Sequence, residues 1–442
     1  MRRANLFALL PQKVDLGSTE TRTDVQATRS SWLVLGIATV LTGIAAGLSG
    51  MLLGMLLHLV QHLAYGYGFG AGHSHESFLS GVTASSPYRR FIVLSLCGIV
   101  AGFGWWVIRR FGSPLVSISN AVRKGDRMPA LTTVAHDLLQ IVTVALGSPL
   151  GREVAPREMG ALFAQFLSRR ARITEEQTRI LVACGAGAGL AAVYNVPLGG
   201  ALFTVEVLLG TFGLSAVVRA ITTSAIAAYI AWIGLGDQTV YVLPHLSIDP
   251  SLIAWSVVMG PVFGYGAFWF RKAVRSAQSK APQDWRLLVW CAVVFPIIGL
   301  IAIPFPQILG NGKGLASLGF DSGLTVGVAA ALLLLKTFVT FGSLRAGAQG
   351  GLLTPSLAIG TAFATVMSGL WNWIWPGTQP GAFAIVGGTA FLAASQRMPL
   401  TAIVLMLEFT RFDHDFLIPT AFAVAGSIFA FYVSDKRSER QV

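Results

Sequence analysis

The sequence predicts an all-helical integral membrane protein built from two inverted repeats with broken and re-entrant helices. Three observations lead to this prediction. Of the 442 residues, 54% are hydrophobic and only 12% are charged, whereas about a quarter of the residues in ordinary soluble domains are charged. Several apolar runs approach the roughly 20 residues that cross a bilayer as a helix. Short glycine-rich breaks also recur in the two halves at a nearly constant offset.

The long apolar runs give the order of the expected membrane helices. They cover residues 32–59, 91–108, 216–235, 252–270, 288–304, 323–341 and 416–433. Two further runs, 138–146 and 161–167, are too short to cross a bilayer. We interpret these as broken or re-entrant helices, because backbone ends inside a membrane are tolerated only where protein or a watery cavity satisfies them.

Both halves of the chain carry the same break followed by the same kind of helix. The residues that coincide at an offset of 200 or 202 are Gly151 with Gly351, Gly160 with Gly360, Pro197 with Pro399 and Glu206 with Glu408. Paired breaks at matching positions of two hydrophobic halves are the best sequence sign of a transporter's binding site. The offset therefore predicts a site where the segments near residues 151 and 351 meet.

The same pattern sets the expected boundaries. Residues 1–31 form a polar, basic arm without the short apolar segment and small-residue cleavage site of a signal peptide, so we expect this arm in the cytoplasm. Residues 32–236 form the first membrane repeat, 237–250 a polar connection and 251–435 the second repeat. Residues 436–442 are a short cytoplasmic tail. Both termini are thus expected on the cytoplasmic side.

The segment Gly151-Arg152-Glu153 puts charge into a chain that is otherwise mostly apolar. Ionisable residues within a membrane are functional-site candidates. The segment lies between a glycine-rich break and the apolar run that begins at Ala161, so we interpret it as the start of a helix within the membrane. Such a start presents free N–H groups and the positive end of the helix dipole, and both favour an anion.

The matching segment of the second half is Gly351-Leu-Leu-Thr-Pro355, which has no charge at the position that corresponds to Glu153. If both helix starts point to one place, the N–H groups of Leu352 and Leu353 are natural donors to an anion. Glu153 would then be a tethered anion that competes for the same place.

The net charge of +12 does not indicate a protein that binds nucleic acid. The basic residues gather between the apolar runs, which is typical of the positive-inside bias and of contact with anionic lipid headgroups. Cys97, Cys184 and Cys291 lie singly in apolar runs, so we expect small buried side chains without a disulfide or a metal cluster. The sequence implies no cofactor.

A transporter of metal cations is one alternative. His58 and His62, with a later loop that contains His73, His75 and Glu76, could in principle collect a metal ion. That function needs carboxylates that face a pore near the middle of the membrane. This chain instead offers glycine breaks rich in free amide groups, which suit an anion.

An intramembrane hydrolase is a remote alternative. The segment Gly47-Leu-Ser-Gly50 is similar to the serine motif of intramembrane proteases, with Ser49 as the nucleophile and His58 or His62 as its base. Both histidines lie toward the end of the same predicted helix. Their axial distance from Ser49 makes the hydrogen bond between nucleophile and base unfavourable.

Together, these segments resemble the CLC family of chloride channels and proton–chloride exchangers from about residue 32 to residue 435. Gly151-Arg152-Glu153 resembles the family's GREGP motif, the segment 351–355 its GxFxP motif, and Gly112-Ser113 its GSGIP motif. The supporting matches are Tyr194-Asn-Val-Pro-Leu198, Phe203-Thr-Val-Glu206, Arg397-Met-Pro-Leu-Thr401 and Leu407-Glu-Phe-Thr410.

The resemblance implies roles for particular residues. Glu153 matches the glutamate that forms the family's external gate. The positions that match the anion-binding backbone and hydroxyl groups are Ser113, Gly351, Leu352 and Leu353. The residues that support these motifs are Gly151, Arg152 and Pro355. The resemblance also implies a homodimer with one anion pathway per subunit.

The chain departs from the family pattern in several places. Val154 and Ala155 stand where GREGP has Gly-Pro, and Leu353 replaces the aromatic residue of GxFxP. The family's pore tyrosine has no match, since Tyr432 comes too early in the chain. Val207 stands at the position of the exchangers' internal proton glutamate. An apolar residue there resembles the channels, because a proton relay needs a titratable group or a chain of water.

We therefore expect transport of chloride and similar small anions through a pore gated by Glu153, and no enzymatic activity. Val207 favours a channel, and proton-coupled exchange by another internal proton route is the alternative. A buried carboxylate has a raised pKa, so chloride flux should increase as external pH falls. The expected partners are chloride and the lipid bilayer, with protons in the exchanger alternative. The expected location is a bacterial inner (plasma) membrane.

Overall fold

The structure is a computed structural model that describes residues 22–66 and 77–440. The chain divides into two compact units, Met1–Ile37 and Ala38–Val442. In the first unit, the described part is the beginning of helix α1 (Arg22–Tyr65). This helix starts within the segment predicted as a polar arm, because residues 22–31 contain neither glycine nor proline to stop it.

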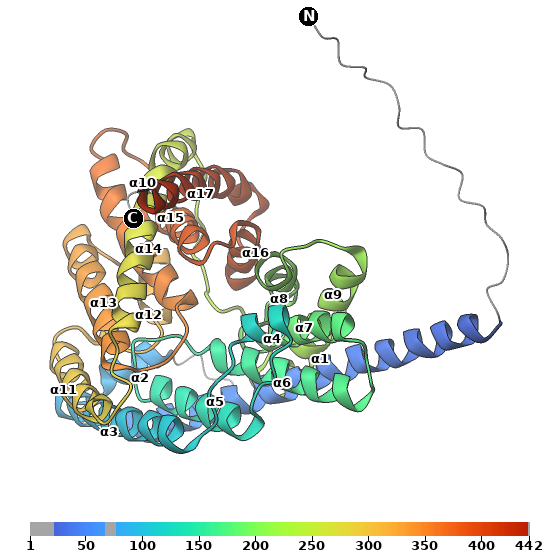
Figure 1. The fold of residues 1–442 in the computed structure, drawn as a ribbon. Helices are drawn as coiled ribbons and strands as arrows, with labels where there is room; N and C mark the ends of the chain where they lie inside the picture. Colours follow the sequence, from blue (N-terminus) through green and yellow to red (C-terminus); the bar gives the residue numbers. More distant parts are fainter. Residues whose placement is uncertain (1–21, 67–76, 441–442) are drawn as a thin grey trace, which may run out of the picture. The chain divides into compact units, whose positions relative to one another are not determined.

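Every regular element that the structure describes in the second unit is helical, so the prediction of an all-helical fold is confirmed (Figure 1). After α1 the helices are α2 (Phe78–Ala84), α3 (Pro87–Phe111), α4 (Ile118–Lys124), α5 (Ala130–Ala145), α6 (Val154–Arg170), α7 (Glu175–Tyr194), α8 (Pro197–Phe203), α9 (Leu214–Leu235), α10 (Pro250–Ser279), α11 (Arg286–Ile301), α12 (Lys313–Phe320), α13 (Val326–Ala346), α14 (Leu353–Trp371), α15 (Pro380–Gln396), α16 (Pro399–Thr410) and α17 (Leu417–Glu439). The shorter turns are the π-helical η1 (Thr204–Leu209) and the 3-10 turns η2 (Pro306–Ile308) and η3 (His414–Phe416).

Seven helices in the described part of the chain are long and apolar enough to cross a membrane. These candidate spans are Trp32–Tyr65, Pro87–Phe111, Leu214–Leu235, Pro250–Ser279, Val326–Ala346, Leu353–Trp371 and His414–Glu439. Shorter apolar helices accompany them at Ala130–Ala145, Pro197–Leu209, Arg286–Ile301 and Pro399–Thr410. This mixture of full-length and short apolar helices fits the predicted multi-pass membrane protein.

Several helices differ in length from the sequence prediction, and two of these differences have a clear local cause. The long run expected at 288–304 is the shorter helix α11, because Pro304 and Pro306 follow it and the residues before a proline disfavour helical backbone. The short run at 161–167 belongs to the longer helix α6, since the charged residues Arg157 and Glu158 interrupt the apolar pattern without ending the helix.

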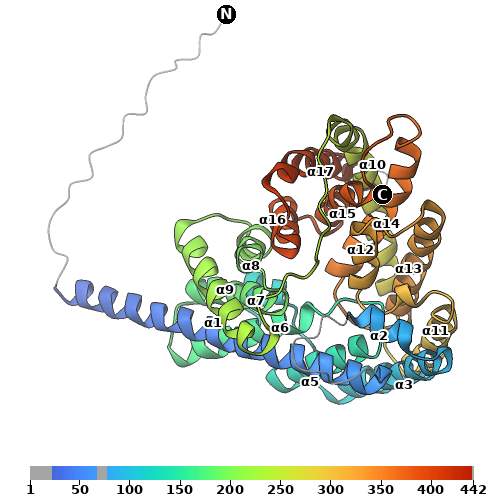
Figure 2. The same cartoon turned by 180° about the vertical axis from the view of Figure 1, so that it is seen from behind.

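The order of the helices repeats along the chain. The helices from α3 to α9 and those from α11 to α17 correspond in order, although not in every length, and the short α4 corresponds to the short α12. In both views, α8 of the first half lies beside α16 of the second (Figure 1 and Figure 2). Corresponding helices of the two halves thus meet, as an inverted repeat requires.

Small residues let α6 and α7 approach each other closely. A Cβ atom added to Gly160 would lie 2.1 Å from the carbonyl oxygen of Gly185, and one added to Gly185 would lie 2.3 Å from that of Gly160. Backbones at this distance leave no room for a side chain, which is how small residues act between membrane helices. The glycine-rich segment 185–189 therefore serves helix packing, and it fixes the position of α6.

Candidate functional site

The two glycine-rich breaks meet in the structure. Gly151 and Gly351 form an isolated antiparallel bridge. The Gly151 N–H donates to the Gly351 carbonyl at 2.7 Å, and the Gly351 N–H donates to the Gly151 carbonyl at 2.9 Å. Helix α6 begins after the first break and α14 after the second. The starts of two helices are therefore held next to each other inside the protein.

The side chain of Glu153 caps the start of α14. Glu153 is the N-cap residue of α6 and is buried, with 1% of its surface exposed. Its Oε1 accepts a hydrogen bond from the Leu353 N–H at 2.7 Å. Leu353 is the first residue of α14, and the N-cap residue Leu352 provides no side-chain cap of its own. A carboxylate from the first half thus sits at the positive end of a helix dipole in the second half.

This arrangement requires glycine at both bridge positions. A Cβ atom on Gly151 would lie 2.1 Å from Oε2 of Glu153, and a Cβ atom on Gly351 would lie 2.0 Å from Oε1. Both distances are far below van der Waals contact. Any larger residue at either position would push the carboxylate away from Leu353.

The side chain of Glu153 does not cap its own helix, because another side chain accepts from the start of α6. The Ala155 N–H donates to Oε1 of Gln140, on α5, at 3.0 Å. Arg157, in the first turn of α6, acts electrostatically on Glu153, and its guanidinium carbon lies 4.3 Å from the ring centre of Phe203. The buried carboxylate therefore has one helix end and one cation to balance its charge.

A phenol that the sequence analysis did not select also contacts this carboxylate. Tyr194, the last residue of α7, donates to Oε2 of Glu153 at 3.2 Å, and its oxygen lies 2.7 Å from Oγ1 of Thr354. The guanidinium of Arg152 packs over the Tyr194 ring at 5.2 Å from its centre. The sequence could have indicated this residue, because a tyrosine at the end of an apolar, glycine-rich helix is expected to be buried, and a buried phenol needs a hydrogen-bond partner.

Comparison with known proteins identifies the family. A sequence model described as a voltage gated chloride channel matches residues 97–432, which is well over half of the chain. The chain belongs to the voltage-gated chloride channel (CLC) family. Both glycine-rich breaks lie within the matched residues, so the resemblance inferred from the sequence motifs is confirmed. The apolar helices and the family together establish a multi-pass integral membrane protein.

Curated bacterial relatives from this family carry two kinds of name. The voltage-gated ClC-type chloride channel ClcB of Citrobacter koseri is 27% identical over 352 residues, which cover 76% of this chain and 82% of the relative. The H(+)/Cl(−) exchange transporter ClcA of Vibrio campbellii is 28% identical over 353 residues, which cover 75% of each chain.

Solved CLC structures share the fold. A slow cyanobacterial Cl−/H+ antiporter matches with a TM-score of 0.76 and 19% identity, over 90% of this chain and 94% of the other. A CLC-type fluoride/proton antiporter matches with a TM-score of 0.65 and 19% identity, over 93% and 96%. At this identity the likeness shows the fold alone, which agrees with the predicted fold class.

In this CLC chain, Ser113 lies in an extended, exposed segment before α4. Its N–H donates to Oγ1 of Thr132 at 3.1 Å. The cap of α4 is Ser117, whose hydroxyl accepts from the Asn120 N–H at 3.2 Å. Pro114 explains why Ser113 is not helical, because the residue before a proline disfavours helical backbone. Ser113 therefore does not cap α4, and its contact with an anion stays a prediction.

Val207 lies in the π-helical turn η1 and packs, half-buried, against the core. The carboxylate of its neighbour Glu206 caps α16. Oε1 of Glu206 accepts from the Leu400 N–H at 3.0 Å, and Oε2 accepts from the Thr401 N–H at 2.7 Å and from its hydroxyl at 2.5 Å. The glutamate next to Val207 is thus bound to a helix end.

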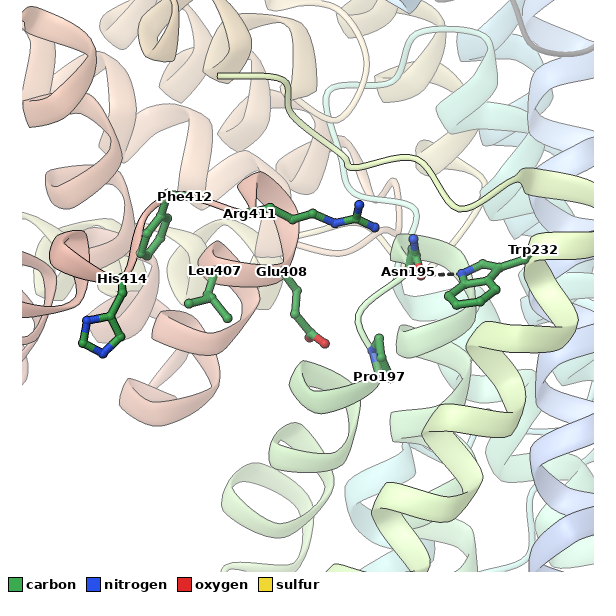
Figure 3. A pocket seen from close by; sticks show the side chains of 8 residues that line it. All are labelled: Asn195, Pro197, Trp232, Leu407, Glu408, Arg411, Phe412 and His414. Atoms are coloured by element: carbon green, nitrogen blue, oxygen red, sulfur yellow. Dashed lines mark hydrogen bonds between the residues drawn. The ribbon is translucent and has the colours of Figure 1, made fainter. Parts of the chain in front are cut away.

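The second half makes the corresponding contact, from α16 to the start of α8. The carboxylate of Glu408, on α16, accepts from the Leu198 N–H at 2.9 Å and from the Gly199 N–H at 2.7 Å. It therefore caps the start of α8. Figure 3 shows this side chain pointing toward Pro197, at the start of α8. The hollow around it has a volume of 410 Å³ and is lined by Asn195, Pro197, Trp232, Leu407, Glu408, Arg411, Phe412 and His414.

Other residues considered from the sequence lie apart from this site. Tyr432 is 55% exposed on α17 and packs beside Lys436, so its phenol is not part of the buried group around Glu153. The hydroxyl of Ser49 donates to the Ala46 carbonyl at 3.0 Å. His58 follows on the same helix, roughly 13 Å farther along its axis, so the geometry does not support a hydrolase. His73, His75 and Glu76 lie outside the described residues.

Proposed function

We propose that the chain carries chloride and similar small anions across the membrane through a pathway gated by Glu153. The observation that carries this proposal is the 2.7 Å hydrogen bond from the Leu353 N–H to the Glu153 carboxylate. This bond marks a buried place where a helix end holds a negative charge. A chloride ion that has lost its water needs the same donors.

The proposed site binds an anion without placing a full positive charge on it. The amide groups of Leu352 and Leu353 replace part of the hydration shell, and the bridge at Gly351 fixes their position. Ser113 is the hydroxyl donor expected from the family resemblance. Coordination by dipoles holds the ion weakly enough for it to leave again, which conduction requires.

The charge of Glu153 gives the pathway its gate. The ionised carboxylate occupies the Leu353 N–H and excludes chloride from it. Protonation removes the charge and weakens this bond, because charge-assisted hydrogen bonds are about twice as strong as neutral ones. Burial disfavours a charged carboxylate, so acid favours the open state. Flux through the pathway is therefore expected to rise as external pH falls.

Val207 supports a passive channel, since it offers no titratable group at the internal position of the exchangers. Proton-coupled exchange is the second candidate. It is supported by relatives that are named H(+)/Cl(−) exchange transporters, such as ClcA of Vibrio cholerae at 31% identity over 298 residues. In that case the proton follows a route that does not include Val207.

We also infer a homodimer with one pathway per subunit, in a bacterial inner membrane, with both termini in the cytoplasm. The family resemblance and the bacterial sources of the relatives support this inference. Mass photometry of the purified protein in detergent tests the dimer. Labelling of cysteines introduced near each terminus by a membrane-impermeant reagent in intact cells tests the orientation, and labelling from outside would contradict it.

Chloride efflux from proteoliposomes, recorded together with external pH, tests the function. We compare wild type, Glu153→Ala and, as a matched control, Glu175→Ala, whose side chain is 95% exposed. Chloride efflux without a proton signal indicates a channel. Proton uptake that follows chloride efflux and disappears in Glu153→Ala, while chloride still moves, indicates an exchanger. Folded wild-type protein that moves no chloride refutes the proposal.

A further inference from the structure

A second group of ionisable side chains is buried beside the gate helix α6, outside the proposed anion pathway. His136 and Asp137 come from α5, and Glu158 comes from α6. One polar atom of each lies within 4.8 Å of the others. His136 is 5% exposed and Asp137 is 0% exposed. Ionisable groups inside a membrane protein are costly, so this cluster demands a physical explanation.

Asp137 lacks the donors that a buried carboxylate needs. Among the described residues, no donor group reaches either of its oxygens or Oε2 of Glu158, and the side chain that Asp137 contacts is the carboxyl group of Glu158. Two ionised carboxylates this close together and away from water repel each other strongly. A proton on one of them removes a charge and supplies the missing donor. The geometry therefore calls for a bound proton.

The orientation of His136 agrees with this assignment. Nε1 of Trp105 donates to Nδ1 of His136 at 3.3 Å. The ring proton must then sit on Nε2, which lies 3.9 Å from Oε2 of Glu158. An imidazole that accepts at one nitrogen is neutral. The exchangeable proton thus belongs to the two carboxyl groups, with His136 beside them.

The neighbouring helices place positive charge near the cluster. Arg109 of α3 acts electrostatically on His136, and Arg157 of α6 acts on Glu158. Helix α1 contributes apolar side chains to this region, through Leu53 and Leu57. Two arginines oppose the approach of a divalent cation to these three side chains. A proton is therefore a better occupant than a metal ion.

Arg157 also connects the cluster with the gate. On α6 it follows Glu153 by four residues, about one helical turn, and directly precedes Glu158, and both carboxyl groups act electrostatically on its guanidinium. Glu158 lies about 7.5 Å farther along the axis of α6 than Glu153. Gln140, one turn after Asp137 on α5, caps the start of α6. A change of charge at Glu158 therefore changes how strongly Arg157 stabilises the ionised carboxylate of Glu153.

We propose that His136, Asp137 and Glu158 form a buried proton-binding site that controls the gate through Arg157. The proposal deepens the proposed function and rests on it, because it adds a titratable group that acts on the gate in a chain whose position 207 is apolar. With the proton bound, Arg157 supports the ionised Glu153 and the gate stays closed. When the proton leaves, the doubly charged carboxyl pair attracts Arg157 and repels the ionised Glu153, so Glu153 takes up its own proton, and the gate opens, at a higher pH.

Infrared difference spectroscopy of the reconstituted protein tests for the proton itself. The experiment uses the Glu153→Gln background, so that the gate carboxyl contributes no signal. We expect a C=O band of a protonated carboxyl group at neutral pH that is lost when Asp137→Asn is added. The control Asp321→Asn, at an exposed turn, should keep the band. A spectrum that does not change with Asp137→Asn would overturn the proposal.

The pH dependence of chloride efflux tests the link to the gate. In Glu158→Gln, Arg157 no longer has the carboxylate of residue 158 beside it and interacts with that of Glu153 alone. The ionised form of Glu153 is therefore more stable. We expect the midpoint of acid-activated flux to move to lower pH by roughly one unit. The control Glu175→Gln should keep the wild-type midpoint. A wild-type midpoint in folded Glu158→Gln would overturn the proposed control of the gate.

Two results separate this proposal from the others. Wild-type protein without chloride flux would refute the proposed function, while the infrared experiment would still decide whether the proton site exists. A stoichiometric divalent cation, found by elemental analysis and lost in Asp137→Asn, would overturn the proton assignment. Both substitutions keep the size of the side chain, and gel-filtration elution at the wild-type position shows that each variant is folded.

Discussion

Carboxylates cap helix starts in two regions of this molecule, and the two regions differ in symmetry. Around α8 and α16, Glu206 caps the second-half helix and Glu408 caps the first-half helix. Around α6 and α14, the backbone bridge between Gly151 and Gly351 is equally symmetric. The side chains are not, since Glu153 caps α14 whereas the corresponding residue of the second half is Leu353.

Under the proposed function, the same carboxylate cap serves stability in one region and gating in the other. Where both halves keep the carboxylate, each helix start is permanently paired and the two halves hold each other together. Where only one half keeps it, a single carboxylate faces donors that an anion can also use. We therefore propose that the asymmetric pair is the one that opens.

Removal of the charge at the asymmetric site should have the largest effect. In Glu153→Gln, the Leu353 N–H loses a charge-assisted hydrogen bond worth about 1.5–3 kcal/mol. Chloride flux at neutral pH should therefore rise by about tenfold or more and should lose its pH dependence. Chloride-electrode recordings from proteoliposomes between acidic and neutral pH measure both. Flux that still increases on acidification would show that Glu153 is not the gate.

Displacement of the carboxylate should have a nearly equal effect. In Gly351→Ala, the new Cβ would lie 2.0 Å from Oε1 of Glu153. The carboxylate has to leave the Leu353 N–H, so flux at neutral pH should rise severalfold in the same assay. Gly327→Ala is the control, because no atom of the described residues beyond its chain neighbours and its own helix backbone lies within 4 Å of the added Cβ there. A folded Gly351→Ala protein with wild-type flux would contradict the described position of the carboxylate.

The symmetric pair should respond in stability instead of gating. In Glu408→Gln, one of the two N–H donors of α8 loses its charged acceptor, which costs about 1.5–3 kcal/mol. Thermal unfolding in detergent, followed by tryptophan fluorescence, should show a lower midpoint, while the pH profile of chloride flux stays unchanged. Glu206→Gln should behave in the same way. A changed pH profile in either variant would abolish the distinction between the two regions.

Removal of the phenol should have the smallest effect. Tyr194→Phe deletes a 3.2 Å hydrogen bond to Oε2 of Glu153, worth about 1 kcal/mol. The ionised carboxylate loses a donor, so protonation occurs at higher pH and the midpoint of acid-activated flux moves upward. Flux at neutral pH should increase less than in Glu153→Gln. A midpoint that moves downward would mean that Tyr194 supports the open state.

The sequence predicted the helical class and the location in a membrane, because both depend on the types of residue in the apolar runs. It predicted that the two breaks meet, because they recur at a nearly constant offset. It placed Glu153 and Leu353 at one site, and the structure joins them with a hydrogen bond. It did not predict where α4 starts. Pro114 disfavours helical backbone at Ser113, and the structure places the cap of α4 at Ser117.

What the sequence by itself determined is therefore the fold class, the family and the identity of the charged break. Only the tertiary structure decided which side chains surround that break. Tyr194, Gln140 and Arg157 reach it or its helix from separate positions in the chain. Local periodicity records which face of a helix is apolar, but the distance between two side chains on different helices depends on how closely and at what angle those helices pack.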